Sequence, residues 1–517
     1  MDENAALQRL RSLRANYRRL CDALPWLDAA RCEDDPPAFP AHARDVGLPA
    51  VRRVTADERL LSAGPPEPAL AVYDPGASPP LGRDEPLWVA LAERRIPLVV
   101  LHTDAELTDI GAFAATYPRL PVIIESGPVK LLYHFAQLQD LLSAQRSLYL
   151  CTYNLCNWLG LERLCQAGLA SRLLFGTHAP RYNAHCAMGP IALASLPWDV
   201  RCDLAGNNLR RLLGLPPVAT SEPSVEPVDP FVIDAHTHSG PSGRFPVPDE
   251  GFISRDWLRF MDCQAIERLC LVPMESLYDA AAVPTMLTAD LRREAQGRIV
   301  CLEVFHPGAG PAHLARIETS LRDRECVGIK LHPSFHAVSA DDPRYEPAYA
   351  LAERLGVPLL THSWDVSPTN PAQELSHPER FRPHLQQHPR VRLVLGHAGG
   401  RPGALEAVVG LCSDFAGVAV DLAGDYFDSG LVECLVDRLG ADRVLYGSDM
   451  NWVDPRANLA PVLAADISDE DALAVLRGNA ERVYLTPAPP SREWRRGEAG
   501  LRPLMGSPLD QVKRDRG

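Results

Sequence analysis

The sequence predicts an α/β protein whose second half is a (β/α)8 barrel. After residue 230, short runs rich in Leu and β-branched residues alternate with amphipathic segments such as "PAYALAERLG" (347–356). Continuously apolar strands that alternate with helices predict a parallel sheet covered by helices, and a count of eight predicts closure into a barrel. The eight predicted strands are "FVIDAH" (231–236), "IERLCLVP" (266–273), "RIVCLEVF" (298–305), "CVGIKLHP" (326–333), "GVPLLTHS" (356–363), "VRLVLGHA" (391–398), "GVAVDLAG" (417–424) and "DRVLYGSD" (442–449).

Composition limits the classes of function and partner. The chain has 517 residues, of which 46% are hydrophobic and 23% charged, which is ordinary for a globular protein of two or three domains. A net charge of -14 argues against nucleic acid or an anionic membrane as the main partner. We find no secretory signal pattern and no apolar run of membrane-spanning length, so we expect a cytoplasmic protein that acts on a small molecule, with a homo-oligomer left open.

A segment rich in Pro, Ser and acidic residues divides the chain. The stretch "GLPPVATSEPSVEPVDP" (214–230) has no apolar periodicity and is typical of a linker. We therefore predict a first domain over residues 1–215, a linker over 216–230 and the barrel over 231–488. Residues 489–517 have weak periodicity and are predicted to form a tail.

Polar side chains follow five of the predicted strands. Because the carboxyl ends of barrel strands meet at one rim, these side chains are expected to converge there. Imidazole and carboxylate groups are the ligands of a borderline divalent ion such as zinc or manganese. Alternation along a strand puts two of the histidines on the same face, about 6–7 Å apart, where both can hold one ion. The residues concerned are His236, His238, Lys330, His332, His362, His397 and Asp449.

The ordered motifs resemble the amidohydrolase superfamily, and specifically its amidohydrolase-related branch. They are D-A-H-T-H, G-I-K-L-H-P, P-L-L-T-H, L-V-L-G-H-A-G-G, Y-G-S-D and "RGNAERVYL", over about residues 228–488. The resemblance implies a TIM barrel with one divalent ion, zinc or alternatively manganese, bound by His236, His238, His362 and Asp449. It also implies that His397 contacts the metal-bound water or the substrate, while Asp449 accepts a proton.

Other residues at the strand ends have less certain roles. In two-metal relatives the lysine corresponding to Lys330 is carbamylated and bridges the ions, whereas in the amidohydrolase-related branch it is unmodified. His332 is expected either to bind substrate or to make a structural hydrogen bond. Trp364, Asn451 and Trp452 follow strand ends and are expected to line the substrate pocket.

The first half is similar to the second at nearly constant offsets. "YPRLPVIIESGP" (117–128) parallels "HPRVRLVLGHAG" (388–399), an offset of 271 residues (388 − 117). "ASRLLFGTH" (170–178) parallels "ADRVLYGSD" (441–449), and the offset is again 271 (441 − 170). "IPLVVLH" parallels "VPLLTHS" at 261 (357 − 96), and "WLDAARC" parallels "VIDAHTH" at 206 (232 − 26). We predict a divergent internal duplication.

The predicted duplication indicates that the first half is a degenerate amidohydrolase-like domain without metal ligands. Between its first and fifth strands it has 64 residues (96 − 32), against 119 (357 − 238) in the second half, so it is predicted to be a truncated barrel. Its open sheet edge would need a cover, from a helix at 4–22, the second half or another subunit. We expect a structural remnant, with a lid or partner-binding role as the alternative. Opposite His236, His238, His362, His397 and Asp449 stand Ala30, Cys32, Leu101, Ser126 and His178.

Four functions are compatible with these residues. The favoured one is a metal-dependent hydrolase that uses an activated water on a small ester, lactone or amide, with Asp449, His397 and Lys330 as catalytic residues. The first alternative is a nonoxidative decarboxylase of an unsaturated or aromatic acid, which carbon dioxide release would identify; isomerisation of a sugar acid is a weaker possibility. The non-enzyme alternative is a metal-containing scaffold, which a partner interaction dependent on residues 1–215 would favour.

Overall fold

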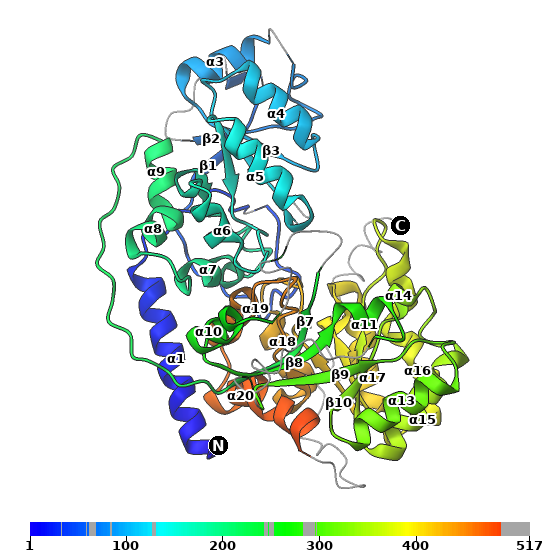
Figure 1. Cartoon of the computed structure of the whole chain (residues 1–517). Coiled ribbons are helices and arrows are strands. Elements are labelled where there is room, and N and C mark those ends of the chain that lie inside the picture. Colours follow the sequence, from blue (N-terminus) through cyan, green and yellow to red (C-terminus); the bar gives the residue numbers. More distant parts are fainter. Residues whose placement is uncertain are drawn as a thin grey trace.

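The computed structural model describes residues 1–486 except 33, 58, 61–68, 83–84, 127–130, 242–246, 248–252, 283–294 and 296. The predicted tail over 489–517 and most of the loop over 239–251 lie outside the described residues. The described chain forms a six-stranded parallel sheet followed by an eight-stranded one, each flanked by helices (Figure 1). The predicted α/β class with a barrel in the second half is confirmed.

The eight strands of the second half form a barrel in simple sequential order. Each strand pairs in parallel with the next. The first and last strands also meet, because Ala235 N donates to Tyr446 O and Asp449 N donates to His236 O, each at 2.9 Å. Each predicted strand window overlaps one of these strands, and only β7 extends beyond its window, to Ser239. They are β7 (Val232–Ser239), β8 (Ile266–Pro273), β9 (Ile299–Val304), β10 (Cys326–Leu331), β11 (Pro358–His362), β12 (Arg392–Gly396), β13 (Val418–Asp421) and β14 (Val444–Leu445).

The barrel strands are buried on both faces, which explains their nearly continuous apolar sequences. Strand β11 is buried at every position, and Leu360 packs inside the barrel with Val394 and Leu302 of other strands. The preceding helix α15 (Glu346–Leu355) ends at Gly356, which adopts φ 67° and so lets the chain turn into the strand. The polar residues that follow the strands are therefore carried on a rigid, fully packed frame.

The first half contains six parallel strands whose outer edges meet a short segment of the same half. Asp28 N donates to Pro49 O and Val51 N donates to Asp28 O, while Ala29 N donates to Phe175 O. Residues 28 and 29 therefore lie between the start of β1 and the end of β6, and they cover the edge that we expected a helix, the second half or another subunit to cover. The strands are β1 (Arg52–Thr55), β2 (Ala69–Val72), β3 (Leu98–Leu101), β4 (Val122–Glu125), β5 (Leu148–Cys151) and β6 (Leu173–Leu174).

The predicted N-terminal helix is present as α1 (Glu3–Ala23), but it packs elsewhere. It contacts α19 (Pro455–Ala464) and α20 (Asp469–Leu473) of the second half, as well as α7 (Ala184–Ala192). Arg14 donates to Leu463 O at 3.0 Å and Ala465 O at 2.7 Å, and it pairs with Asp469 at 2.7 Å. The helix runs alongside both halves and fastens them together (Figure 1).

The two halves also pack directly on each other. Helices α7 and α19 form the largest helix–helix contact of the described structure. Beside them, Arg456 of α19 is 1% exposed in its side chain and binds Glu162 of the first half at 2.5 and 3.0 Å. A buried ion pair of this kind is costly to separate, so it joins the halves tightly. None of the described helices has both the length and the hydropathy that crossing a bilayer requires.

Candidate metal centre

Polar residues from several barrel strands converge at the carboxyl rim. One ligand atom from each of His236, His397 and Asp449 lies within 4.8 Å of the others, and all three side chains are buried. His238 joins them, since its Nε2 is 3.1 Å from Asp449 Oδ1. The rings of His236 and His238 lie on the same side of β7 with centroids 5.3 Å apart, as strand alternation predicts.

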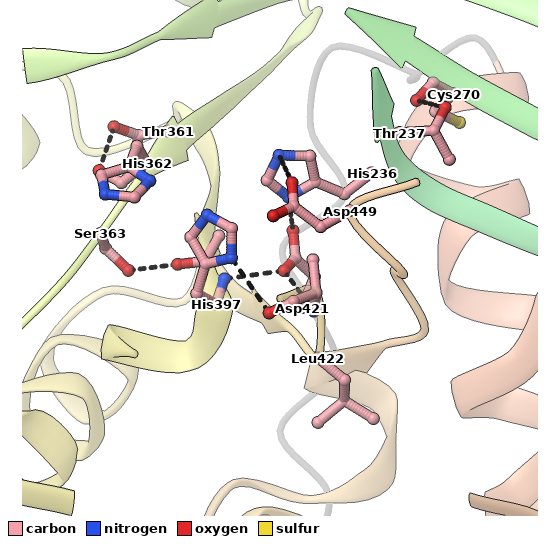
Figure 2. A network of polar contacts seen from close by, with 12 residues as sticks. His236, Thr237, Cys270, Thr361, His362, Ser363, His397, Asp421, Leu422 and Asp449 are labelled. Carbon is pink, nitrogen blue, oxygen red and sulfur yellow. Dashed lines mark hydrogen bonds and ion pairs between the residues drawn. The ribbon is translucent and has the colours of Figure 1, made fainter. Parts of the chain in front are cut away.

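The imidazoles are held so that Nε2 faces the centre. His236 Nδ1 is bound to Asp421 Oδ2 at 2.9 Å (Figure 2). His238 Nδ1 is bound to Val272 O at 3.1 Å, and His397 Nδ1 to Ala423 O at 3.0 Å. Outer hydrogen bonds at Nδ1 fix both the ring orientation and the tautomer in which Nε2 carries a lone pair. His236 and His397 are thus prepared to bind a cation through Nε2, whereas His238 Nε2 faces Asp449 at 3.1 Å and would release its proton when a cation binds.

Asp421 is a residue of the site that the sequence analysis missed. It lies at the end of β13 and is fully buried. Besides His236, its carboxylate accepts from the backbone N–H groups of His397 at 2.8 Å and Ala423 at 3.0 Å through Oδ1. The available signal was a single carboxylate at the end of the apolar run "GVAVDLAG". Asp421 positions two histidines at once.

Lys330 lies next to His236 in the barrel. Its side chain is fully buried on β10, and Nζ is 2.7 Å from His236 Nε2. Burial lowers the pKa of Lys330 to about 8, and the negative charges of Asp421 and Asp449 partly oppose this shift. The amine is therefore within reach of the centre, as predicted for a strand-end lysine.

His362 is adjacent to this group but faces partly away from it. Its ring centroid is 4.8 Å from that of His397, while its Nε2 is bound to Gln373 Oε1 at 2.8 Å. The ring is stacked between His332 at 4.3 Å and Trp364 at 5.5 Å. Its predicted role as a metal ligand remains a prediction, and in this structure it belongs to an aromatic stack along the pocket wall.

The electrostatics of the centre favour the neutral forms of His236, His362 and His397 and an ionised Asp449. Burial lowers the pKa of His397 to about 4, and it also lowers the pKa values of His236 and His362. Burial alone would raise the pKa of Asp449, but the hydrogen bond from His238 and the nearby imidazoles hold it well below its usual value. Metal binding needs these protonation states.

The centre opens into a cavity of about 800 Å³. This volume is typical of small-molecule sites. His332, Trp364 and Trp452 line the cavity, as predicted. Asn451 is not among the described residues that line it, because its side chain is fully buried and its Nδ2 donates to Gly240 O at 3.2 Å. The structure therefore gives Asn451 a structural contact instead of the expected place on the pocket wall.

Arg401 is a further cavity residue that the sequence analysis missed. Its guanidinium carbon lies 4.8 Å from the centre of the Trp364 ring, and its Nη2 is 3.1 Å from Asp425 Oδ2. Arg401 comes four residues after His397, beyond the strand end, so only its position in the fold identifies it. The wall of the cavity thus carries a cation stacked on an aromatic ring.

The corresponding region of the first half has a different chemistry. Within the described part of the chain, no cluster of three possible metal-binding side chains lies there. Instead, the buried carboxylate of Glu125 is bound by His178 at 2.6 Å and by Arg53 at 3.0 Å. A guanidinium and an imidazole neutralise this carboxylate, and the expected lack of a metal site in the first half stays a prediction.

Comparisons with known proteins bear on the second half. The family model for amidohydrolases matches residues 233–485. Gamma-resorcylate decarboxylase of Rhodococcus jostii (strain RHA1) is 29% identical over 188 residues, in a match that covers 28% of this chain and 55% of that protein. The match thus spans about half the length of this curated relative.

Solved structures resemble the same half. One is 2,6-dihydroxybenzoate decarboxylase complexed with 2,6-dihydroxybenzoate, with 18% identity, a TM-score of 0.41 and coverage of 50% of this chain and 100% of its own. A dihydroxybenzoic acid decarboxylase from Polaromonas sp. JS666, with bound manganese and 2-nitroresorcinol, has 18% identity, a TM-score of 0.39 and coverage of 49% and 96%. A putative amidohydrolase from Staphylococcus aureus has 15% identity, a TM-score of 0.39 and coverage of 49% and 99%. Residues 233–485 therefore form an amidohydrolase domain, which confirms the resemblance that the sequence motifs indicate.

Proposed function

We propose that this protein is a metal-dependent, nonoxidative decarboxylase of an aromatic or unsaturated carboxylic acid. The observation that carries the proposal is the position of Arg401, stacked on Trp364 in the cavity that also contains His397 and Asp449. A guanidinium recognises a carboxylate or another anionic substituent, and a flat indole favours a flat substrate. The matched relative, gamma-resorcylate decarboxylase, supports this choice over hydrolysis, which the sequence motifs alone favoured.

Arg401 is held in place before any substrate arrives. Asp425 and the carbonyl of Gly400, at 2.6 Å from Nη1, bind part of the guanidinium, and Trp364 supports its face. A guanidinium has five N–H donors, so these contacts leave donors for an incoming anion. A neutral ester or lactone would have no use for such a cation.

The donor set fits one divalent ion. His236, His238 and Asp449 would hold it, with His397 close by and His362 as the predicted further ligand. Nitrogen and carboxylate donors of this number suit zinc or manganese. When bound, the ion would supply a Lewis acid that polarises an oxygen of the substrate.

Decarboxylation replaces a carbon–carboxylate bond by a carbon–hydrogen bond. One proton is consumed at the substrate carbon, and the electron pair of the broken bond stays with the substrate as carbon dioxide leaves. Asp449 through its carboxylate and His397 through Nε2 are the cavity-lining groups at the centre that can hold this proton. Lys330 would hold positive charge beside them and stabilise the anionic substrate.

Hydrolysis is the second candidate, and the position of Asp449 favours it. The Asp449 carboxylate lines the cavity beside His238, where it is placed to accept a proton from an attacking water. The two functions therefore differ in the direction of proton transfer at the same residue.

The experiment is metal analysis followed by a substrate screen. Protein purified without chelators should contain about one equivalent of zinc or manganese, and the His236→Ala/His238→Ala variant should contain almost none. Metal-loaded enzyme is then offered hydroxybenzoates and unsaturated acids in one series and esters and lactones in another. Carbon dioxide release from an acid supports the proposal, whereas turnover of esters alone, or a chain that binds no metal, overturns it.

A further inference from the structure

The first half contributes a side chain to the cavity of the barrel. Tyr133 lies on the short helical turn η1 (Leu131–His134), which follows strand β4 in the first half. It lines the same cavity as His397, Asp449 and Arg401. The cavity wall is therefore incomplete without the first half.

This approach of η1 follows from the way the two halves pack. Helix α7 begins 271 residues before α19 (455 − 184), the offset that also relates the predicted repeats. At the same offset, Gly189 corresponds to Ala460 (460 − 189), and these two positions touch: a Cβ on Gly189 would lie 2.5 Å from the Ala460 Cβ. A position that contacts its own counterpart indicates an isologous, nearly two-fold interface.

A two-fold interface makes contacts reciprocal. In the second half, η9 (Pro402–Ala404) directly follows Arg401, and η1 begins 271 residues before it (402 − 131). Arg401 binds Asp425. Shortly after Asp425, Phe427 O accepts from Asn183 N at 2.8 Å and Ser429 N donates to Arg181 O at 3.1 Å, so this part of the second half lies at the interface with the first half. The corresponding first-half segment then meets the second half, where it brings Tyr133 to the cavity.

Exposed apolar side chains lie along the wall of this cavity. Among the described residues, few large apolar side chains are well exposed, and Tyr133 at 37% and Val366 at 59% both line the cavity. Tyr278, 56% exposed, packs edge-to-face on Phe335, another lining residue, at 4.9 Å. Exposed apolar side chains that gather around one opening indicate a surface meant to contact an apolar body.

We propose that the first half acts as a specificity element, in which Tyr133 contacts the ring of an aromatic substrate held in the barrel. This inference rests on the proposed function for the choice of acids, but the contact itself requires only an aromatic substrate. Tyr133 is a binding residue at the mouth, so it affects KM and leaves kcat nearly unchanged. An intact first half is then needed for selectivity as well as for stability.

The test compares Tyr133→Ala, Tyr133→Phe and the control Val89→Ala in the full-length, metal-loaded enzyme. Val89 is 44% exposed on α3 (Pro86–Arg94) of the first half and does not line this cavity. The substrates are paired: 2,6-dihydroxybenzoate with cis,cis-muconate for decarboxylation, and phenyl acetate with ethyl acetate for hydrolysis. We expect Tyr133→Ala to lower the aromatic-to-aliphatic ratio of kcat/KM by about three- to tenfold, through KM.

The controls separate this inference from the proposed function. Tyr133→Phe keeps the ring and should retain the ratio within about twofold, as should Val89→Ala. If only the esters are turned over, the proposed decarboxylase function is overturned. The ratio of kcat/KM for phenyl acetate to that for ethyl acetate then tests the role of Tyr133. An unchanged ratio in Tyr133→Ala, or a loss confined to kcat, overturns the specificity role. Failure to bind or convert any of the four compounds overturns both proposals.

Discussion

His236 and His397 are linked through one buried carboxylate. Asp421 accepts from His236 Nδ1 with one oxygen and from the His397 backbone N–H with the other, at 2.9 and 2.8 Å. His236 lies on β7 and His397 directly follows β12, and strands β13 and β14 lie between these two strands in the barrel, so a single side chain sets their mutual geometry.

Asp421→Asn is therefore expected to weaken metal binding. The amide preserves the shape of the side chain but loses the negative charge that holds the Nδ1 proton of His236. Loss of an outer partner of this kind costs about 10- to 100-fold in metal affinity. Competition with a chromogenic chelator measures the effect, and Asp437→Asn, an exposed position, is the control. Equal affinity in the two variants would contradict the role of Asp421.

Removal of the barrel histidines and of their first-half counterparts should have opposite outcomes. His236→Ala/His238→Ala should abolish both bound metal and activity, because two Nε2 donors are lost. Cys32→Ala/His178→Ala should leave metal per folded chain and activity nearly unchanged, since His178 binds Glu125 in the first half. Elemental analysis of the folded fraction checks both. Loss of metal from the second variant would refute a first half without a metal site.

Arg401→Ala should discriminate between charged and neutral substrates. Without the guanidinium, a carboxylate loses a charge-assisted hydrogen bond, and kcat/KM for acids should fall by about 10- to 100-fold. Phenyl acetate has no anionic group and should be affected by less than about threefold. Steady-state kinetics on both substrates provide the comparison, and an equal loss for the two would argue against anion recognition.

Substitutions of Arg456 and of Glu162, which form the ion pair between the halves, should lower the free energy of unfolding by different amounts. Arg456 binds both Glu162 and Asp454, so Arg456→Met leaves two buried carboxylates without their guanidinium. Its removal should lower the free energy of unfolding by about 3–5 kcal/mol. Glu162→Gln leaves the Asp454 pair intact and should cost less. Urea denaturation, followed by two spectroscopic probes, measures the free energy of unfolding of both variants. A larger decrease in Glu162→Gln than in Arg456→Met would contradict this prediction.

Stability should decrease between pH 7 and pH 5, partly through His185. Burial lowers the pKa of this imidazole to about 4, below the ordinary value of 6.5. The unfolded chain therefore binds the proton more tightly, and folding loses free energy as the pH falls from about 6.5 toward 4. For His185 alone the loss by pH 5 is about 2 kcal/mol. His185→Gln should therefore lose about 2 kcal/mol less of its free energy of unfolding between pH 7 and pH 5. Urea denaturation at both pH values measures this difference, and an equal loss in the wild-type protein and the variant would contradict the assignment to His185.

The barrel was predictable because its strands are buried on both faces. Side chains on both faces of each strand, such as Leu360 and Val394 inside the barrel, are buried and therefore apolar. Each strand is then visible in the sequence as a nearly continuous apolar run. His236, His238 and Asp449 were predictable because they follow strand ends, where a barrel collects its functional groups. The strand period was enough to place two of these imidazoles together.

Residues whose role depends on packing between distant segments could not be predicted. Arg401 is identified only by the face of Trp364 beneath it and by Asp425 beside it. Tyr133 reaches the cavity through the contact between the halves, which no local periodicity encodes. The segment that covers the open edge of the first sheet was also predicted wrongly. Asp28 and Ala29 cover it through backbone hydrogen bonds, which residue types do not reveal.

The contact between α1 and the end of the barrel has a consequence for protein synthesis. Arg14 and Asp469 are separated by 455 residues, so the first helix leaves the ribosome long before its partner exists. At typical elongation rates the wait is about half a minute or more. During that time the part of α1 that packs on α19 and α20 lacks the surface that buries it in the finished protein. A nascent chain that stalls before residue 469 would expose this part of the helix, which makes α1 a natural site for chaperone binding during translation.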